Sequence, residues 1–384
     1  MAGKIMNNPD LTWETTYTHN IGLDFSLWHS KVSGSVEVYQ NDTKDLLINF
    51  PVKGTGYDSQ YRNLGSTRNR GVELTLNMPL VTNKDFSLNL SGNIAYNRNR
   101  VVDLGGLKSI TAESGWASTE IGPDYIVEVD QPLGNMYGYV SDGRYSISDF
   151  DFTNGKWVLK EGVVDCSSIV GSGFMRPGAP KFKDLDKDGL PDKKVIGNAS
   201  PDFQGGFSLS GYFKGIDFGA NFNYMIGNDV YNANKIEFNS SRKFTTLRNL
   251  TTLSNLDNRW TNVDWNTGEL ITDPAALEAA NKGTTLWAPF VQNAIFSDYA
   301  VEDGSFLRLQ SATIGYTLPE TLTEKVHIRK LRFYATGTNL FCLTKYSGYD
   351  PEVDTRRATP LTPGVDCSAY PKSRGYVFGV NVTF

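Results

Sequence analysis

The sequence predicts an all-β protein, specifically a transmembrane antiparallel β-barrel. Apolar and polar side chains alternate with a period of two over long segments, which is the pattern of a β-strand. Short turns and very long connections alternate between these segments, as in bacterial outer-membrane barrels. No apolar stretch approaches the ~18 residues of a membrane-spanning helix. Hydrophobic residues are 39% of the 384 residues, which does not distinguish the chain from a soluble protein and does not argue against a barrel, because only alternate strand residues need be apolar.

Composition excludes several classes of function. The net charge of −5 comes with no basic run, so nothing indicates nucleic-acid binding. Three Cys and three His supply no metal cluster or catalytic dyad at a recognisable spacing. No Ser/His/Asp or paired-carboxylate arrangement stands out, so we expect no enzyme and no required cofactor. The first sixteen residues contain no apolar signal-peptide segment, and we therefore expect a piece of a longer exported protein.

The first four strands are expected at residues 11–27, 32–47, 70–78 and 86–102. The first segment alternates most clearly. A soluble strand is typically ~5–6 residues long, whereas a tilted membrane strand needs ~9–11 residues within the hydrocarbon. The apolar face of the first segment carries Trp13, Tyr17, Ile21, Leu23, Phe25 and Leu27.

Seven more strands complete a predicted set of about eleven. A short helix is expected near Pro274–Asn281, within the longest connection. The strands are expected at 124–130, 135–147, 203–213, 216–226, 303–318, 329–342 and 375–384.

Strand direction follows from the connections. Short turns of barrels are periplasmic and long loops extracellular, so the last strand ends in the periplasm. Counting back, the first strand runs the same way. Two such strands cannot pair antiparallel, and an open edge in lipid leaves backbone groups unpaired. We therefore expect these strands to be only part of a ring.

Several short motifs occur together in a fixed order. Jointly they resemble the C-terminal part of the SusC/RagA family of TonB-dependent outer-membrane transporters, and the resemblance covers residues 1–384 as part of one barrel domain. The motifs are Asn8–Thr16, Asn69–Glu73, Lys183–Gly189, Ile196–Asn198, Gly304–Leu309, Ile314–Pro319, Thr338–Phe341 and Tyr349–Glu352.

The resemblance implies a 22-stranded barrel closed by an N-terminal plug, of which these strands are the C-terminal half. It implies import of oligosaccharides or peptides across the outer membrane of a Gram-negative bacterium, among lipid and lipopolysaccharide. A SusD-like surface lipoprotein would form a lid, and TonB–ExbB–ExbD would supply energy. The plug and TonB box have no counterpart here. A surface glycan-binding or adhesin-type β-protein, or a truncated product without activity, remain as alternatives.

An acidic loop is a candidate cation site. Carboxylates stand at positions 1, 3, 5 and 9 of a calcium-type loop, with Gly189 at the sharp turn. The bidentate Glu expected at position 12 is replaced by Val195. A structural Ca²⁺ and a solvated acidic turn without metal are both open. The candidate ligands are Asp184, Asp186, Asp188, Asp192 and the carbonyl of Leu190.

Aromatic residues in the predicted extracellular loops are candidates for contact with a ligand or the lid. Aromatic rings stack on sugars and anchor protein interfaces; packing within the loops is the alternative. The residues are Trp116, Trp157, Trp260, Trp265, Trp287, Tyr346, Tyr349 and Tyr370.

Three further predictions concern the C-terminal region. Cys342 and Cys367 flank the last extracellular loop, where the compartment permits a disulfide; free thiols are the alternative. Arg308 shares a strand face with Ile314 and Tyr316, so we expect it at headgroup level. The alternating terminal face resembles the signal read by outer-membrane assembly machinery. It comprises Tyr376, Phe378, Val380, Val382 and Phe384.

Overall fold

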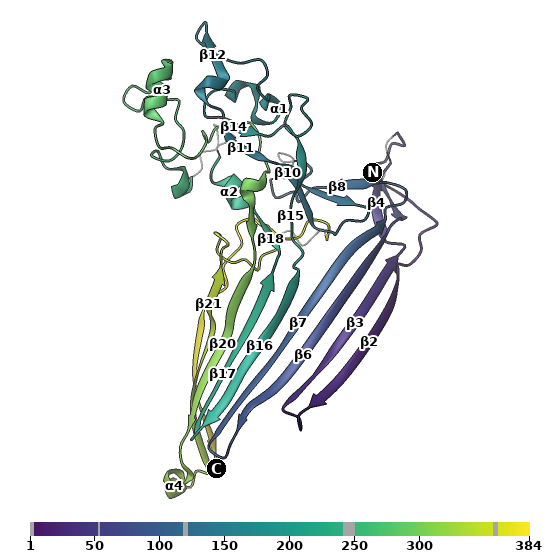
Figure 1. The fold of residues 1–384 in the computed structure, drawn as a ribbon, viewed down its shortest axis with the longest axis vertical. Helices are drawn as coiled ribbons and strands as arrows, with labels where there is room; N and C mark the ends of the chain where they lie inside the picture. The colour runs from purple at the N-terminus through teal and green to yellow at the C-terminus, as the bar shows by residue number, and fades with distance from the viewer. Residues whose placement is uncertain (1–3, 53, 118–121, 241–249, 356–359) are drawn as a thin grey trace.

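The computed structural model describes residues 4–52, 54–117, 122–240, 250–355 and 360–384. A long antiparallel sheet carries a folded region at one end (Figure 1). We call the sheet the barrel sheet. We call the region built from the described residues of 4–14 and of the long connections 45–65, 104–202, 227–305 and 345–374 the head. The N-terminus lies beside the head and the C-terminus lies at the opposite end of the sheet (Figure 1).

The barrel sheet contains nine strands, in the order β2-β3-β6-β7-β16-β17-β20-β21-β23. Every neighbouring pair is antiparallel. The strands are β2 (Thr15–Leu27), β3 (Val32–Lys44), β6 (Ser66–Thr82), β7 (Phe86–Asp103), β16 (Phe203–Phe213), β17 (Ile216–Ile226), β20 (Phe306–Thr317), β21 (Lys330–Thr344) and β23 (Gly375–Thr383).

The two edge strands confirm that the first and last strands of the sheet run in the same direction. Within the described residues, β2 pairs with β3 alone in this sheet and β23 with β21 alone, so both are edges. With an odd number of antiparallel strands between and including them, β2 and β23 point the same way. The turns far from the head are short, and the turn before β21 holds α4 (Glu320–Thr323) and η6 (Glu324–Val326).

The predicted count of eleven barrel strands is wrong for the described residues, which contain nine in this sheet. The segments predicted at 124–130 and 135–147 form strands in the head instead: β9 and β10 belong to a separate sheet ordered β15-β10-β9-β8, and β11 pairs with β14. Tyr125, Ile126 and Val127 are buried in succession, so both faces of that strand are covered by protein. A barrel strand instead has a lipid face and a lumen face.

The head contains short strands and helices. The predicted helix near Pro274–Asn281 is confirmed as α3 (Pro274–Ala280), where Asp273 caps the amide of Ala276 at 2.8 Å and Pro274 occupies the first turn. The head strands are β1 (Ile5–Met6), β4 (Leu47–Pro51), β5 (Ser59–Asn63), β8 (Ser109–Ala112), β9 (Tyr125–Glu128), β10 (Asn135–Tyr139), β11 (Ser141–Arg144), β12 (Phe150–Thr153), β13 (Lys156–Leu159), β14 (Pro180–Phe182), β15 (Lys193–Asn198), β18 (Asp229–Asn232), β19 (Val301–Asp303) and β22 (Val365–Asp366). Its other helical segments are α1 (Ser167–Val170), α2 (Ala233–Glu237), η2 (Ile147–Asp149), η3 (Ser172–Phe174), η4 (Thr252–Ser254) and η5 (Asp298–Ala300).

The long connections pack together around shared cores. Tyr125 and Met136 come from the connection between β7 and β16, Tyr231 and Phe296 from that between β17 and β20, and Val365 from the last connection. All five are buried in one cluster. The three-stranded sheet β19-β18-β22 joins the last two of these connections. The head is therefore a folded unit that excludes water from its own interior. No helix in the described ranges is both long and apolar enough to cross a membrane.

Candidate functional site

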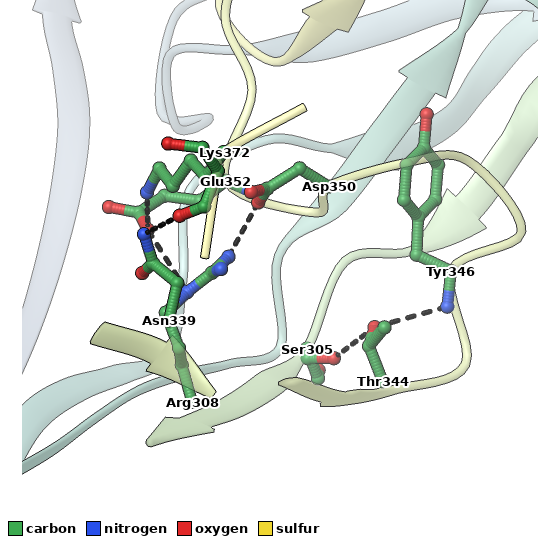
Figure 2. A network of polar contacts seen from close by, with 9 residues as sticks. Ser305, Arg308, Asn339, Thr344, Tyr346, Asp350, Glu352 and Lys372 are labelled. Atoms are coloured by element: carbon green, nitrogen blue, oxygen red, sulfur yellow. Dashed lines mark hydrogen bonds and ion pairs between the residues drawn. The ribbon is translucent and has the colours of Figure 1, made fainter. Parts of the chain in front are cut away.

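The joint between head and barrel sheet is built around Arg308. Its side chain is only 5% exposed. One guanidinium nitrogen donates to Asp350 Oδ1 at 2.6 Å, and Nε lies 3.7 Å from Glu352 (Figure 2). Lys372 also pairs with Glu352. Arg308 belongs to the sheet and its carboxylate partners to the last head connection, so these charges hold the connection against the sheet.

The prediction that Arg308 lies at headgroup level is wrong, and a β-bulge explains why. The pairing register of β20 shifts between Leu309 and Ser311 against both neighbouring strands. Relative to β17, β20 has one extra residue at this place, and this reverses the alternation of its side chains. Arg308 therefore shares a face with Ser311 and Thr313, which pair with Asn221 and Gly219 on the polar side, and not with Ile314.

A second set of contacts fixes the start of the same connection. Thr344 Oγ1 donates to the carbonyl of Ser305 at 2.8 Å and accepts from the amide of Tyr346 at 3.1 Å (Figure 2). The Tyr346 hydroxyl donates to Asp366 Oδ2 at 2.6 Å. Burial, together with this carboxylate, raises the pKa of Tyr346, so the phenol stays protonated and keeps donating.

A buried carboxylate, Asp124, lies in the main core of the head. It is fully enclosed, accepts from the Ser114 amide at 2.7 Å and from the Ser114 hydroxyl. Tyr231 interacts with the same carboxylate and accepts from Trp116 Nε1 at 2.6 Å. Burial raises the pKa of Asp124 to about 6, although the Ser114 hydrogen bonds oppose the rise. The sequence reading missed Asp124, because an acidic residue beside a strand normally indicates a solvated turn.

Five of the eight candidate aromatic residues pack inside the head. Trp116, Trp260 and Tyr346 are buried. Trp157 packs against core residues, and Trp287 forms an edge contact with Tyr299 at 4.5 Å between ring centroids. Their positions favour loop packing over ligand contact.

The other three candidate aromatic residues are exposed. Trp265 is 57% exposed, Tyr349 83% and Tyr370 92%. Their rings are accessible to a ligand or a partner protein. The predicted contact role stays a prediction for these three.

The acidic loop has part of the predicted geometry. Ligand-type oxygens of Asp184, Asp186 and Asp188 lie within 4.8 Å of one another. Asp192 is turned toward the backbone and accepts from the amides of Leu185 and Asp186 at 2.6 and 3.2 Å. The three clustered carboxylates are a hard-oxygen set of the kind that Ca²⁺ prefers, and they also accept hydrogen bonds from backbone amides of the turn, as Asp192 does.

The predicted disulfide is not formed. Cys342 is a free thiol in the structure, which describes both Cys342 and Cys367. Cys342 lies on β21 and pairs in register with Arg308. Cys367 packs against the head core that contains Val365. The two cysteines thus belong to the sheet and to the head core, although they flank one connection.

The terminal strand β23 has the predicted alternation. Tyr376, Phe378, Val380 and Val382 pair with Gly337, Ala335, Phe333 and Leu331 of β21. All four side chains, and Phe384, are exposed. This leaves an apolar face on the edge strand. Its predicted role in assembly remains a prediction.

Comparisons with known proteins agree with this architecture. Residues 2–191 match the family described as "TonB dependent receptor-like, beta-barrel". TonB-dependent receptor P39 of Formosa agariphila is 30% identical over 405 residues, covering 99% of this chain and 36% of the relative. TonB-dependent receptor SusC of Bacteroides thetaiotaomicron is 27% identical over 395 residues, covering 98% of this chain and 32% of SusC. The chain thus spans about a third of the length of these relatives.

Solved structures agree as well. The RagAB peptide importer in its "closed-closed" state superposes with a TM-score of 0.69 at 27% identity, over 98% of this chain and 36% of the other. The sheet, the folded head and these matches define the class: a TonB-dependent receptor-type β-barrel. The chain belongs to the TonB-dependent receptor family. SusC is similar to it in sequence, and the RagAB importer is similar to it in structure.

Proposed function

We propose that the chain forms part of an outer-membrane, TonB-dependent importer of oligosaccharides or peptides. The observation that carries the proposal is the match of nearly the whole chain to the RagAB peptide importer, in sheet and head together. The similarity to SusC supports the same activity class. Membership of a receptor and transporter family, rather than an enzyme family, agrees with this role.

We further propose a SusD-like lipoprotein as the partner at the head. The exposed rings of Trp265, Tyr349 and Tyr370 supply aromatic surface of the kind that anchors interfaces. Energy would come from TonB–ExbB–ExbD through parts of the protein other than the barrel sheet. A lectin-like surface protein would not need the exposed apolar face of β23.

A structural Ca²⁺ at the acidic loop is part of the proposal. Asp184, Asp186 and Asp188 would bind it, and the ion would fix the connection between β14 and β15. It would neutralise three neighbouring carboxylates and take no part in transport chemistry. A chelator should speed up protease cleavage at residues 184–192, and added Ca²⁺ should restore the protection. A cleavage rate that does not change with chelator would contradict a calcium site there.

The function is tested by uptake in the native bacterium. Disrupting the gene should abolish uptake of labelled oligosaccharides or of labelled peptides, because molecules of this size need an active importer. Uptake of monosaccharides and free amino acids serves as the control and should not change. Disrupting the TonB system should give the same loss. Normal uptake of both oligomer classes in the disrupted strain would contradict the proposal.

A further inference from the structure

A pocket in the head lies between two connections that are distant in sequence. Phe174, the last residue of η3, and Arg176 come from the connection between β7 and β16, while Arg259, Trp265 and Phe290 come from the connection between β17 and β20. The cavity volume is about 200 Å³, which is smaller than the roughly 300–1,000 Å³ of sites that enclose a whole small ligand, so the pocket can take only part of a larger one. Of the residues named so far, only Trp265 was a candidate from the sequence.

The pocket carries positive charge without compensation. Arg176 and Arg259 are both half-buried. None of the described residues that line the pocket is acidic. Burial alone lowers the pKa of each guanidinium, and no described carboxylate contributes. A guanidinium nevertheless stays charged in proteins, and a half-buried charge without a partner is unfavourable. An anion in the pocket would relieve this penalty.

Both arginines are held in place by neighbours that leave donors unused. Arg176 donates from Nη2 to the carbonyl of Gly173 at 3.0 Å. The guanidinium of Arg259 lies 5.9 Å from the centre of the Trp265 ring. Each guanidinium has five N–H donors, which is more than these contacts use. Each can therefore still bind a carboxylate through two parallel hydrogen bonds.

The aromatic wall adds a preference for ligands that present an apolar face. Trp265 is more than half exposed, and Phe290 also presents part of its ring to solvent. Trp260, which also lines the pocket, is buried, and the guanidinium of Arg144 lies 4.7 Å from its ring centre. The exposed indole of Trp265 offers one large apolar face. Arginine beside an aromatic face suits a ligand that joins a ring to a carboxylate.

We propose that this pocket binds an acidic saccharide, with the carboxylate of a uronic acid residue held by Arg176 and Arg259 and its ring placed against Trp265. The inference rests on the proposed import function and narrows its substrate to acidic oligosaccharides. A peptide also carries carboxylates, and its binding is one of the outcomes of the test below.

Binding is tested on protein purified from its native outer membrane in detergent. Calorimetric titrations with a galacturonic acid trimer and with the neutral galactose trimer of the same linkage should differ by at least tenfold in Kd. Arg176→Gln and Arg259→Gln should each weaken binding of the acidic trimer tenfold or more. Trp265→Ala should weaken both trimers. Raised salt should weaken the acidic trimer alone.

Arg100→Gln is the matched control. Arg100 belongs to β7, outside the pocket, and lies 3.7 Å from Asp130. Its substitution should leave the Kd unchanged. The heat-induced gel shift of each variant checks that the barrel has folded. Equal affinity for the two trimers, or pocket variants that fold and bind like the parent, would overturn the inference. Tighter binding of a blocked peptide with a free carboxyl terminus, lost in the same variants, would assign the pocket to peptides instead.

Uptake separates the failure of this inference from failure of the proposed function. If only the pocket inference is wrong, gene disruption still abolishes oligomer uptake while the double variant Arg176→Gln/Arg259→Gln transports normally. If the importer function is wrong, disruption itself has no effect. Selective loss of acidic trimer uptake in the double variant supports both.

Discussion

The barrel sheet and the head are stabilised in different ways. The largest fully buried side chains, Tyr125, Tyr145, Tyr231, Phe296 and Met136, all belong to the head. On β2, by contrast, every side chain but one is exposed. A membrane barrel strand faces lipid on one side and the lumen on the other, so its own side chains need no protein core. The sheet depends on backbone pairing and the membrane, whereas the head depends on excluding water.

The largest expected effect comes from the place where the two regions meet. Arg308→Ala should destabilise the attachment of the last connection by about 3–5 kcal/mol, because Asp350 would stay buried without its partner. Protease cleavage within residues 345–355 should become fast, while the sheet stays folded in a heat-induced gel shift. The double variant Arg308→Ala/Asp350→Ala should recover part of the loss. Unchanged cleavage in the single variant would mean that the charges do not hold the joint.

The second prediction concerns the head alone. The pKa of Asp124 is about 6 in the folded head and about 4 in an unfolded chain, so the folded form binds the proton more tightly. Its contribution is fully present below pH ~4 and is lost as pH rises through ~6. The loss is worth roughly 3 kcal/mol. Hydrogen exchange of the Tyr137 amide, which donates to the Asp124 carbonyl, should therefore speed up between pH 4 and 7 beyond its intrinsic rate.

Asp124→Asn should flatten this dependence, since the amide does not titrate. Asp130→Asn, at an exposed carboxylate, is the control and should leave the profile as it is. A parent profile that is flat after correction for intrinsic exchange would contradict the prediction.

The difference between the regions also explains what the sequence revealed. Barrel strands β16 and β17 have their predicted bounds, because a lipid face and a lumen face impose alternation on every residue. The head strands have no such regular environment. β9 is buried on both faces, so its pattern predicted a strand but not the sheet to which it belongs.

The candidate site residues were likewise predicted correctly only where their pattern is local in the sequence. The acidic loop was found from sequence because its spacing is local. Arg308 was misplaced because one extra residue in β20, relative to β17, reverses the alternation between Leu309 and Ser311, whereas the prediction carried one alternation through the whole strand. Its partners in the Tyr349–Glu352 motif are about forty residues away. The sequence did offer one sign of this pairing: the Gly304–Leu309 motif carries a positive charge, the Tyr349–Glu352 motif carries negative charges, and both belong to the same family resemblance.

An intermediate loss of stability is expected at the close contact between Gly379 and Tyr334 within the sheet. An added Cβ on Gly379 would lie 2.3 Å from the ring of Tyr334 on the neighbouring strand. The ring must move, so Gly379→Ala should cost about 1–3 kcal/mol. The temperature of the heat-induced gel shift should fall, and the double variant Gly379→Ala/Tyr334→Ala should partly restore it. No change in the single variant would show that the ring has room to turn.

The smallest loss of stability is expected where a glycine-to-alanine substitution lies beside a flexible side chain. Arg332 on β21 reaches across Gly315 to Asp217 on β17, with two hydrogen bonds of 2.7 and 2.5 Å. An added Cβ on Gly315 would lie 2.5 Å from Nη2 of Arg332. The long side chain can swing away, and a partly exposed ion pair contributes only about 0–1 kcal/mol. Gly315→Ala should therefore shift the gel transition much less than Gly379→Ala, and about as little as Arg332→Gln. If Gly315→Ala proved the more damaging glycine variant, charge pairing rather than ring packing would dominate the stability of this face of the sheet.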